Sequence, residues 1–116
     1  MLNVSAHTKV YFAREPIDMR RQIDGVALQV QEVLALNPMS AHVFVFRNQR
    51  GDRLKGLYWD RNGFVLFYKR IERGRFQWPS VLAHSVELGL RELQWLLEGH
   101  DLSELNACPS LPATAV

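Results

Sequence analysis

The sequence predicts an α+β fold in which a mainly antiparallel sheet of four to five strands is flanked by two helices. Three observations lead to this prediction. Several short runs are rich in β-branched and aromatic residues, as strands are. Two longer stretches space their apolar residues by three and four, as amphipathic helices do. The dipeptide Asn62-Gly63 also separates two strand-like runs, which is a strong hairpin signal.

The first elements are a strand over residues 9–13 and a helix over about 18–36. Asp18 is expected to cap this helix, because its carboxylate can accept hydrogen bonds from the free backbone N–H groups of the first turn. Asn37-Pro38 ends it. One helical face collects the apolar residues Met19, Ile23, Val26, Ala27, Val30, Val33 and Leu34.

Three strands are predicted in the middle of the chain, over residues 42–47, 53–60 and 64–70. Residues 48–52 have turn chemistry, and Asn62-Gly63 joins the second of these strands to the third in a type I′ turn.

The last part of the chain predicts two short strands and a helix. Residues 75–78 are a candidate edge strand, and residues 86–88 are another. A leucine stripe at helical spacing follows, which Gly99 ends as a C-terminal cap: Leu90, Leu93, Leu96 and Leu97.

The two hairpins predict which side chains share a face of the sheet. With Asn62-Gly63 as the turn, Lys55 would face Arg70. If residues 48–52 close with Arg47 opposite Arg53, one face has an apolar zone and a basic zone. The apolar zone consists of Val43, Val45, Leu57, Trp59 and Leu66, and the basic zone consists of Arg47, Arg53, Lys55 and Arg70. Phe44 and Phe46 would lie on the other face. Adjacent like charges oppose strand pairing unless an anion or a carboxylate relieves their repulsion, so this basic zone indicates a phosphate partner.

Length and composition indicate one globular domain, which we expect over residues 1–105, with a flexible tail over 106–116. The 116 residues are 47% hydrophobic and 22% charged, which excludes a disordered or fibrous protein. The single cysteine, Cys108, excludes an internal disulfide framework and a cysteine zinc cage. No apolar run approaches ~18 residues, and the first residues do not resemble a signal peptide, so we expect a cytoplasmic protein without a membrane span.

Positive charge is concentrated in the middle of the chain. The net charge is +2, but residues 47–75 hold nine basic and three acidic side chains, a balance of +6. Such a block attracts polyanions, although a solvated surface that keeps the protein soluble is the simpler alternative. The nine candidate nucleic-acid contacts are Arg47, Arg50, Arg53, Lys55, Arg61, Lys69, Arg70, Arg73 and Arg75.

Three aromatic residues, Trp59, Tyr68 and Trp78, lie among these arginines. They would suit stacking on bases, or they would serve as anchors in a protein interface. For Trp59 and Trp78 an ordinary place in or beside the core is the favoured alternative, because tryptophan is highly buried on average.

No pattern indicates catalysis. The four histidines do not have metal-site spacing, Cys108 falls in the predicted tail, and there is no phosphate-binding glycine loop. A metal-dependent nuclease would need converging carboxylates, and the basic block has only Asp52, Asp60 and Glu72. We therefore expect no catalytic residue, no metal and no cofactor.

Several runs of the chain, read together, resemble one known family. The runs are DMR at 18–20, DGVA at 24–27, FVFR at 44–47, RGDRLK at 50–55, LYWD at 57–60, GF at 63–64, YKR at 68–70, ERGRF at 72–76, WP at 78–79 and LLEG at 96–99. They are similar to the small accessory protein, the second reading-frame product TnpB, of IS66 bacterial insertion sequences. The resemblance covers about residues 8–101. It departs from the family pattern at Gln22, Gly56 and Arg61, and over His100-Asp101-Leu102.

The resemblance implies a role in transposition beside a separate, larger transposase that supplies the catalytic carboxylates. Our leading hypothesis is a non-enzymatic accessory protein that binds DNA through its basic hairpins. One alternative is a protein–protein adaptor, whose arginines pair with acids of the transposase and whose Trp59 and Trp78 anchor the interface. Another is a homodimer, in which the acidic region 87–104 of one copy docks on the basic block of a second.

Overall fold

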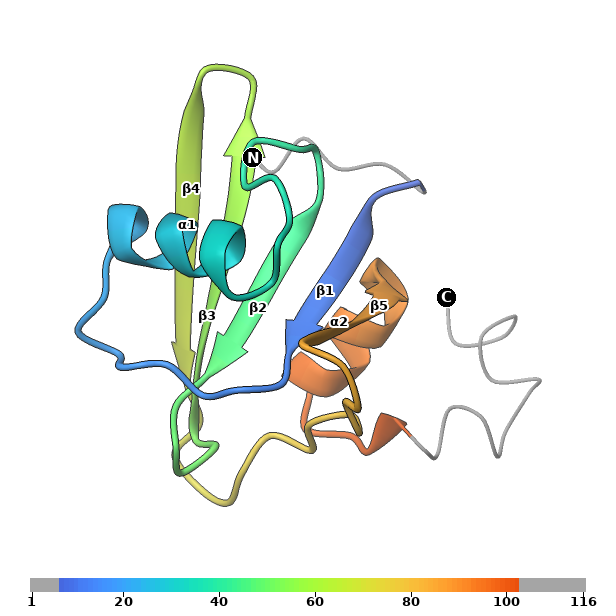
Figure 1. Ribbon diagram of the computed structural model, residues 1–116. Coiled ribbons are helices and arrows are strands. Elements are labelled where there is room, and N and C mark those ends of the chain that lie inside the picture. The colour runs from blue at the N-terminus through green and yellow to red at the C-terminus, as the bar shows by residue number, and fades with distance from the viewer. Residues whose placement is uncertain (1–6, 103–116) are drawn as a thin grey trace.

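A five-stranded sheet lies at the centre of the molecule, and one helix packs on each of its faces (Figure 1). The computed structural model describes residues 7–102, so Cys108 and the predicted tail over 106–116 lie outside the described residues. In chain order the elements are β1 (Lys9–Ala13), α1 (Ile23–Glu32), β2 (Val43–Arg47), β3 (Arg53–Asp60), β4 (Gly63–Arg70), β5 (Ser85–Gly89) and α2 (Leu90–Leu97). The predicted α+β class is confirmed.

The strands follow the order β4-β3-β2-β1-β5 across the sheet. All neighbours are antiparallel except β1 and β2, which pair in parallel. A parallel pair needs a long crossover connection, and α1 with its flanking segments provides it. This crossover brings the end of β1 beside the end of β2.

The turn between β3 and β4 lies one residue earlier than predicted. Asp60 pairs with Gly63, so Arg61 and Asn62 form the turn, and Arg61 has the positive φ of 58°. Lys55 therefore faces Tyr68 rather than Arg70, which faces Arg53. Moving the turn back by one residue changes the cross-strand partner of each residue by two positions. Because side chains alternate between the faces with a period of two, every side chain of this hairpin keeps its predicted face.

The register between β2 and β3 was predicted wrongly by one residue. Arg47 pairs with Leu54 rather than Arg53, because Asn48 and Arg53 close the loop themselves through a backbone hydrogen bond of 3.1 Å. A slip of one residue exchanges the two faces of β2. Its phenylalanines, Phe44 and Phe46, consequently pack beneath α1, and its valines lie on the α2 face.

Helix α1 is shorter than the predicted helix over 18–36, and Asp18 does not cap it. The Asp18 carboxylate instead accepts hydrogen bonds from the Arg20 backbone N–H at 2.9 Å and from the Arg20 guanidinium at 2.6 Å. The hydrogen bonds from the Arg20 side chain lower the pKa of Asp18 to about 2. This carboxylate is therefore engaged in a local turn before the helix begins.

The buried side chain of Lys55 explains why residues 18–22 leave the helical path. Its ammonium group donates to the backbone carbonyl of Met19 at 2.8 Å and to that of Arg21 at 2.6 Å. Both carbonyls thereby satisfy a buried charge in the sheet rather than an amide of a helical turn.

The predicted strand over 75–78 is absent from the described residues, where 71–84 form an irregular segment. Three hydrogen bonds hold this segment against the end of the sheet. Phe76 N–H donates to the Gly51 carbonyl at 2.8 Å, Ile71 N–H to the Asp52 carbonyl at 2.9 Å, and Trp78 Nε1 to the Ala13 carbonyl at 2.8 Å. The segment packs on the sheet end without adding a strand to it.

The last two predicted elements are confirmed as β5 and α2. Gly99 follows α2 with a φ of +94°, its N–H donates to the Leu96 carbonyl, and the His100 N–H donates to the Trp95 carbonyl. This pattern is a Schellman cap, which favours glycine because of its left-handed backbone.

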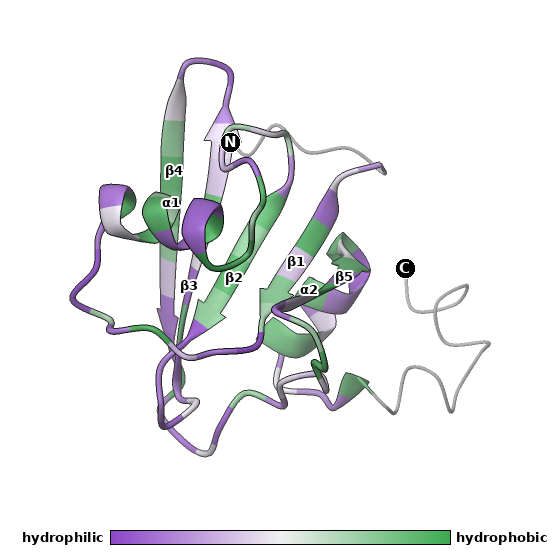
Figure 2. Cartoon of the chain, viewed as in Figure 1, coloured by the Kyte–Doolittle hydropathy of each residue, from purple (hydrophilic) through white to green (hydrophobic). Residues whose placement is uncertain are grey.

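Each face of the sheet has its own apolar cluster. Helix α1 packs against β3 and β4, whereas α2 packs against β1 and β5. Figure 2 shows hydrophobic stretches on the strands between the helices and more hydrophilic residues where strands meet loops. The buried residues of the α1 cluster are Ala13, Ile17, Val26, Val30, Leu34, Phe44, Phe46 and Leu57. Those of the α2 cluster are Val10, Phe12, Val43, Val45, Leu54, Tyr58, Phe76, Leu93 and Leu96.

The close packing of Gly56 makes a first prediction. A Cβ placed on Gly56 would lie 1.9 Å from Cζ of Phe67, its partner on β4. Gly56→Ala should therefore displace the ring and lower the free energy of unfolding in urea by about 1–3 kcal/mol. Gly63→Ala is the matched control, since nothing lies within 4 Å of its added methyl. Equal stability of the two variants would contradict the packing described.

Candidate nucleic-acid interface

Seven arginines gather where β1, β2 and β4 end and β3 begins, at the lower end of the sheet in Figure 1. We call this surface the basic end. Its members are Arg14, Arg47, Arg50, Arg53, Arg70, Arg73 and Arg75. They come from three separate stretches of the chain, around residues 14, 47–53 and 70–75, that the sheet brings together.

Contacts between the loops hold these stretches in place. The hydrogen bonds from Phe76 to Gly51 and from Ile71 to Asp52 join the segment after β4 to the β2–β3 turn. Arg47 Nη2 donates to the Arg14 carbonyl at 3.4 Å, which links the ends of the two parallel strands. The arginines are thus carried by parts of the chain whose relative positions are set by hydrogen bonds.

The Asn48 side chain organises the β2–β3 turn. Its Oδ1 accepts from the N–H groups of Gly51 at 2.9 Å and Arg53 at 3.0 Å, and its Nδ2 donates to Asp52 at 2.7 Å. The bond from Asn48 holds the pKa of Asp52 below its ordinary value, with smaller contributions from the charges of Arg50 and Arg53. Asp52 therefore stays ionised, and its carboxylate is engaged in the turn.

Most of the positive charge at the basic end has no carboxylate partner among residues 7–102. Two arginines form ion pairs, Arg14 with Glu15 at 3.7 Å and Arg70 with Glu72 at 3.0 Å. Within the same range no carboxylate lies within 4 Å of Arg47, Arg50, Arg53, Arg73 or Arg75, and the buried Nε of Arg53 has no hydrogen-bond partner. The seven arginines and the three nearby acids, Glu15, Asp52 and Glu72, together have a formal charge of +4. A surface with this charge attracts anions.

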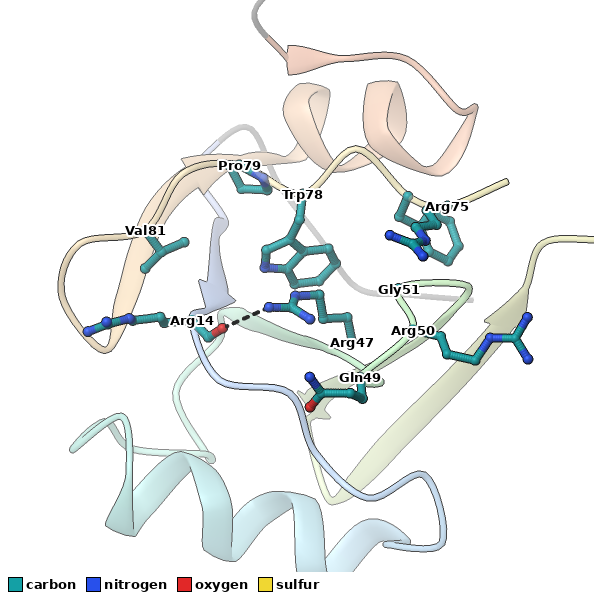
Figure 3. Close-up of a pocket in the computed structure, with 10 residues that line it drawn as sticks. Arg14, Arg47, Gln49, Arg50, Gly51, Arg75, Trp78, Pro79 and Val81 are labelled. Atoms are coloured by element: carbon teal, nitrogen blue, oxygen red, sulfur yellow. Dashed lines mark hydrogen bonds between the residues drawn. The ribbon is translucent and has the colours of Figure 1, made fainter. Parts of the chain in front are cut away.

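A cavity of about 350 Å³ opens within the basic end (Figure 3). Figure 3 shows Arg47 reaching the Arg14 carbonyl beside the Trp78 indole, while the guanidinium groups of Arg14 and Arg50 extend outward on opposite sides. No acidic residue is among those that line the cavity: Arg14, Arg47, Gln49, Arg50, Gly51, Arg75, Phe76, Trp78, Pro79 and Val81. Such an arrangement can hold an anion that carries an apolar or aromatic group.

Six of the nine basic residues singled out from the sequence share the basic end: Arg47, Arg50, Arg53, Arg70, Arg73 and Arg75. Lys55 does not, because its side chain is 3% exposed and its ammonium serves the carbonyls of Met19 and Arg21. Arg61 lies in the β3–β4 turn at the opposite end of the sheet, and Lys69 donates to the Leu97 carbonyl of α2 at 2.7 Å.

Arg14 is the member of the basic end that sequence reasoning missed. It follows β1 directly, and the parallel pairing of β1 with β2 places it beside Arg47. No local signal could have found it, because the pairing joins residues more than 30 positions apart.

The three aromatic candidates lie in different environments. Trp59 is half-buried and packs edge-to-face on Phe64, with 5.0 Å between ring centroids. Tyr68 is 52% exposed on the α1 face, with the Lys55 ammonium 5.4 Å from its ring centroid. Of the three, Trp78 lines the cavity at the basic end.

Residues 7–102 contain no cluster of three or more histidine, cysteine, aspartate or glutamate side chains that could hold a metal ion. No helix in this part of the chain is long and apolar enough to cross a membrane.

Comparison with known proteins places the chain in a family. Residues 8–107 match the family described as IS66 Orf2 like protein. The chain belongs to this family. The family implies an accessory role in the transposition of IS66 insertion sequences, and the resemblance seen in the sequence is confirmed.

Two relatives of this IS66 Orf2-like protein come from Sinorhizobium fredii (strain NBRC 101917 / NGR234). "Uncharacterized protein y4hO" is 42% identical over 101 residues, which cover 87% of this chain and 88% of the relative. "Uncharacterized protein y4jC" is 32% identical over 116 residues, which cover 100% and 99%. No solved structure matches the chain.

The position of Lys55 predicts that it stabilises the fold rather than contacting a ligand. Lys55→Met keeps the aliphatic stem but removes the donor for two carbonyls, so we expect the free energy of unfolding in urea to fall by about 1–3 kcal/mol. Lys69→Met, at an exposed lysine that reaches one carbonyl, should change it by less than about 0.5 kcal/mol. A Lys55→Met protein as stable as the Lys69→Met protein would show that the buried ammonium is dispensable.

Proposed function

We propose that this IS66 Orf2-like protein binds the DNA backbone through its basic end and thereby assists a separate transposase as a non-catalytic accessory protein. The observation that carries the proposal is the set of five arginines at the basic end that have no carboxylate partner among residues 7–102. Guanidinium groups bind phosphate through two parallel hydrogen bonds, which makes arginine a preferred residue for this contact. Phosphate contacts supply affinity with little sequence choice.

The dimensions of the basic end suit a stretch of DNA backbone. From β1 to β4 the sheet spans three inter-strand spacings, which is roughly 14 Å. Successive nucleotides of one strand advance roughly 3.4 Å along the axis of a duplex, so the end of the sheet is long enough to meet more than one phosphate of a strand. Because the sheet and the hydrogen bonds between the loops fix the backbone that carries the arginines, binding would order their side chains but little of the backbone.

The acids near the basic end support a non-catalytic role. Glu15 pairs with Arg14, Glu72 pairs with Arg70, and Asp52 accepts a hydrogen bond from Asn48. Metal-assisted strand cleavage needs carboxylates that converge on shared ions. These three carboxylates are held by separate partners, which supports leaving the chemistry to the transposase.

A second candidate function is an adaptor that docks on the transposase without direct DNA contact. The observation that favours it is Leu82, which is 93% exposed and follows Val81, a residue of the cavity wall. A fully exposed leucine beside unpaired arginines would fit an acidic partner surface that has an apolar depression.

The homodimer alternative has less support from the contacts of the acidic region. Glu87 pairs with Lys9 at 3.4 Å, and Glu92 accepts from the Gly89 N–H at 2.7 Å. Glu98 lies 3.8 Å from His100. These carboxylates have partners within their own chain, so docking on the basic end of a second copy would exchange contacts rather than add them.

DNA binding is tested by electrophoretic mobility shifts across a salt series. The double variant Arg50→Ala and Arg75→Ala should bind a blunt duplex more weakly, and its slope of log affinity against log salt should fall by about two. The matched control is Arg61→Ala with Arg91→Ala, which removes the same charge away from the basic end and should change the slope little. No binding by the native protein even at low salt would refute the proposal.

The adaptor function is tested by capture of the purified transposase from the same element after nuclease treatment. If Leu82 anchors that contact, Leu82→Glu should abolish capture, whereas Leu28→Glu, at a half-exposed leucine of α1, should leave it intact. If both variants still capture the transposase, Leu82 does not anchor the contact, and an adaptor function through this loop is excluded.

A further inference from the structure

The cavity in the basic end has two walls of different chemistry. Apolar atoms come from the segment after β4, where Phe76, Trp78, Pro79 and Val81 lie. Guanidinium groups come from the ends of β1 and β2 and from the β2–β3 turn, through Arg14, Arg47 and Arg50, and Arg75 adds one from the segment after β4. A ligand that fits both walls must carry an anion and a flat or apolar body within one small unit.

The volume sets the scale of this unit. About 350 Å³ lies near the lower limit of ligand pockets, which is roughly 300 Å³. An unpaired nucleotide is a unit of this scale, and unlike a base in a stacked duplex it has a free base face to place on the apolar wall. The duplex contact proposed above accounts for the arginines of the cavity but not for its apolar wall.

The Trp78 indole is already held in position to receive a base. Its Nε1 donates to the Ala13 carbonyl at 2.8 Å, and its ring packs edge-to-face on Phe12 with 5.5 Å between centroids. Because these two contacts hold the ring in place, a base that meets the part of the indole lining the cavity would not require the ring to be ordered first.

The positive charges of two arginines that line the cavity, Arg47 and Arg75, have no carboxylate within 4 Å among residues 7–102. Arg47 donates to the carbonyls of Asn48 and Arg14 over long distances of 3.3 and 3.4 Å. The aliphatic part of the Arg75 side chain lies over Gly51, whose φ of +80° favours glycine at this turn.

We propose that the cavity binds one unpaired nucleotide of a DNA strand, with its base against Trp78 and its phosphate between Arg47 and Arg75. A free nucleotide has the same chemistry, but Arg14 and Arg50 extend outward from the opening, where they would meet the phosphates on either side of the bound nucleotide (Figure 3). The inference rests on the proposed function, because the rest of the strand lies on the basic end.

The test compares three probes by tryptophan fluorescence titration of the full chain. They are a blunt DNA duplex, the same duplex with a short 5′-phosphorylated thymidine overhang, and free thymidine monophosphate. We expect the overhang duplex to bind at least about fivefold more tightly than the blunt duplex, since one stacked base contributes at least that factor. Fluorescence should be quenched by the overhang, and Trp78→Phe should remove that quenching, which distinguishes Trp78 from Trp59 and Trp95.

A second variant avoids the contacts that Trp78 makes with the core. Val81→Glu places a carboxylate in the cavity wall, and Leu28→Glu makes the same chemical change on α1, away from the cavity. Val81→Glu should abolish the preference for the overhang, and Leu28→Glu should retain it. Circular dichroism and the urea midpoint confirm that both variants are folded.

The outcomes separate this inference from the proposed function. Equal binding of blunt and overhang duplexes without quenching, or equal behaviour of Val81→Glu and Leu28→Glu, overturns the nucleotide site and leaves backbone binding in place. Failure of both duplexes to bind at low salt overturns both proposals. Quenching by thymidine monophosphate without binding of either duplex also overturns both, and assigns the cavity to a free nucleotide.

Discussion

The hydrogen bonds of the Asn48 side chain determine much of this structure. By holding the N–H groups of Gly51 and Arg53 and the carboxylate of Asp52, Asn48 closes the β2–β3 loop between itself and Arg53. That closure sets the register of the two strands, and the register decides which residues of β2 face each helix. The same turn carries Arg50 and supplies the Gly51 carbonyl to which Phe76 donates. One amide side chain therefore links the packing of both cores to the arrangement of the basic end.

The basic end concentrates like charges that a fold would otherwise separate. Arg53 and Arg70 are direct cross-strand neighbours, an arrangement that opposes pairing unless something relieves it. Glu72 relieves Arg70, while the buried Nε of Arg53 remains without a partner among the described residues. The fold tolerates this repulsion because the two apolar clusters, on opposite faces, hold the strands together independently of it. Functional surfaces commonly retain local electrostatic cost of this kind, and an anionic partner would remove it.

Local rules predicted the elements well and their ends less well. The leucine stripe and Gly99 predicted α2, and the alternation of β3 and β4 predicted their faces even though the turn lies at Arg61 and Asn62. The predicted helix began too early, because Lys55, some 35 residues further along the chain, takes the carbonyls of Met19 and Arg21. Trp78 resembled a strand residue, but its indole donates to Ala13 across the molecule, and its segment stays irregular. In each case a long-range hydrogen bond overrode a local preference.

The sequence by itself determined the α+β class, the family and the existence of a basic block, because these depend on periodicity, composition and residues close together in the chain. Only the tertiary structure decided which charges of that block lie together. The parallel pairing of β1 with β2 added Arg14, the interior of the sheet took Lys55, and the length of β3 and β4 carried Arg61 to the far end. Charge acts through distance in space, and distances between strands are set by pairings that no local pattern encodes.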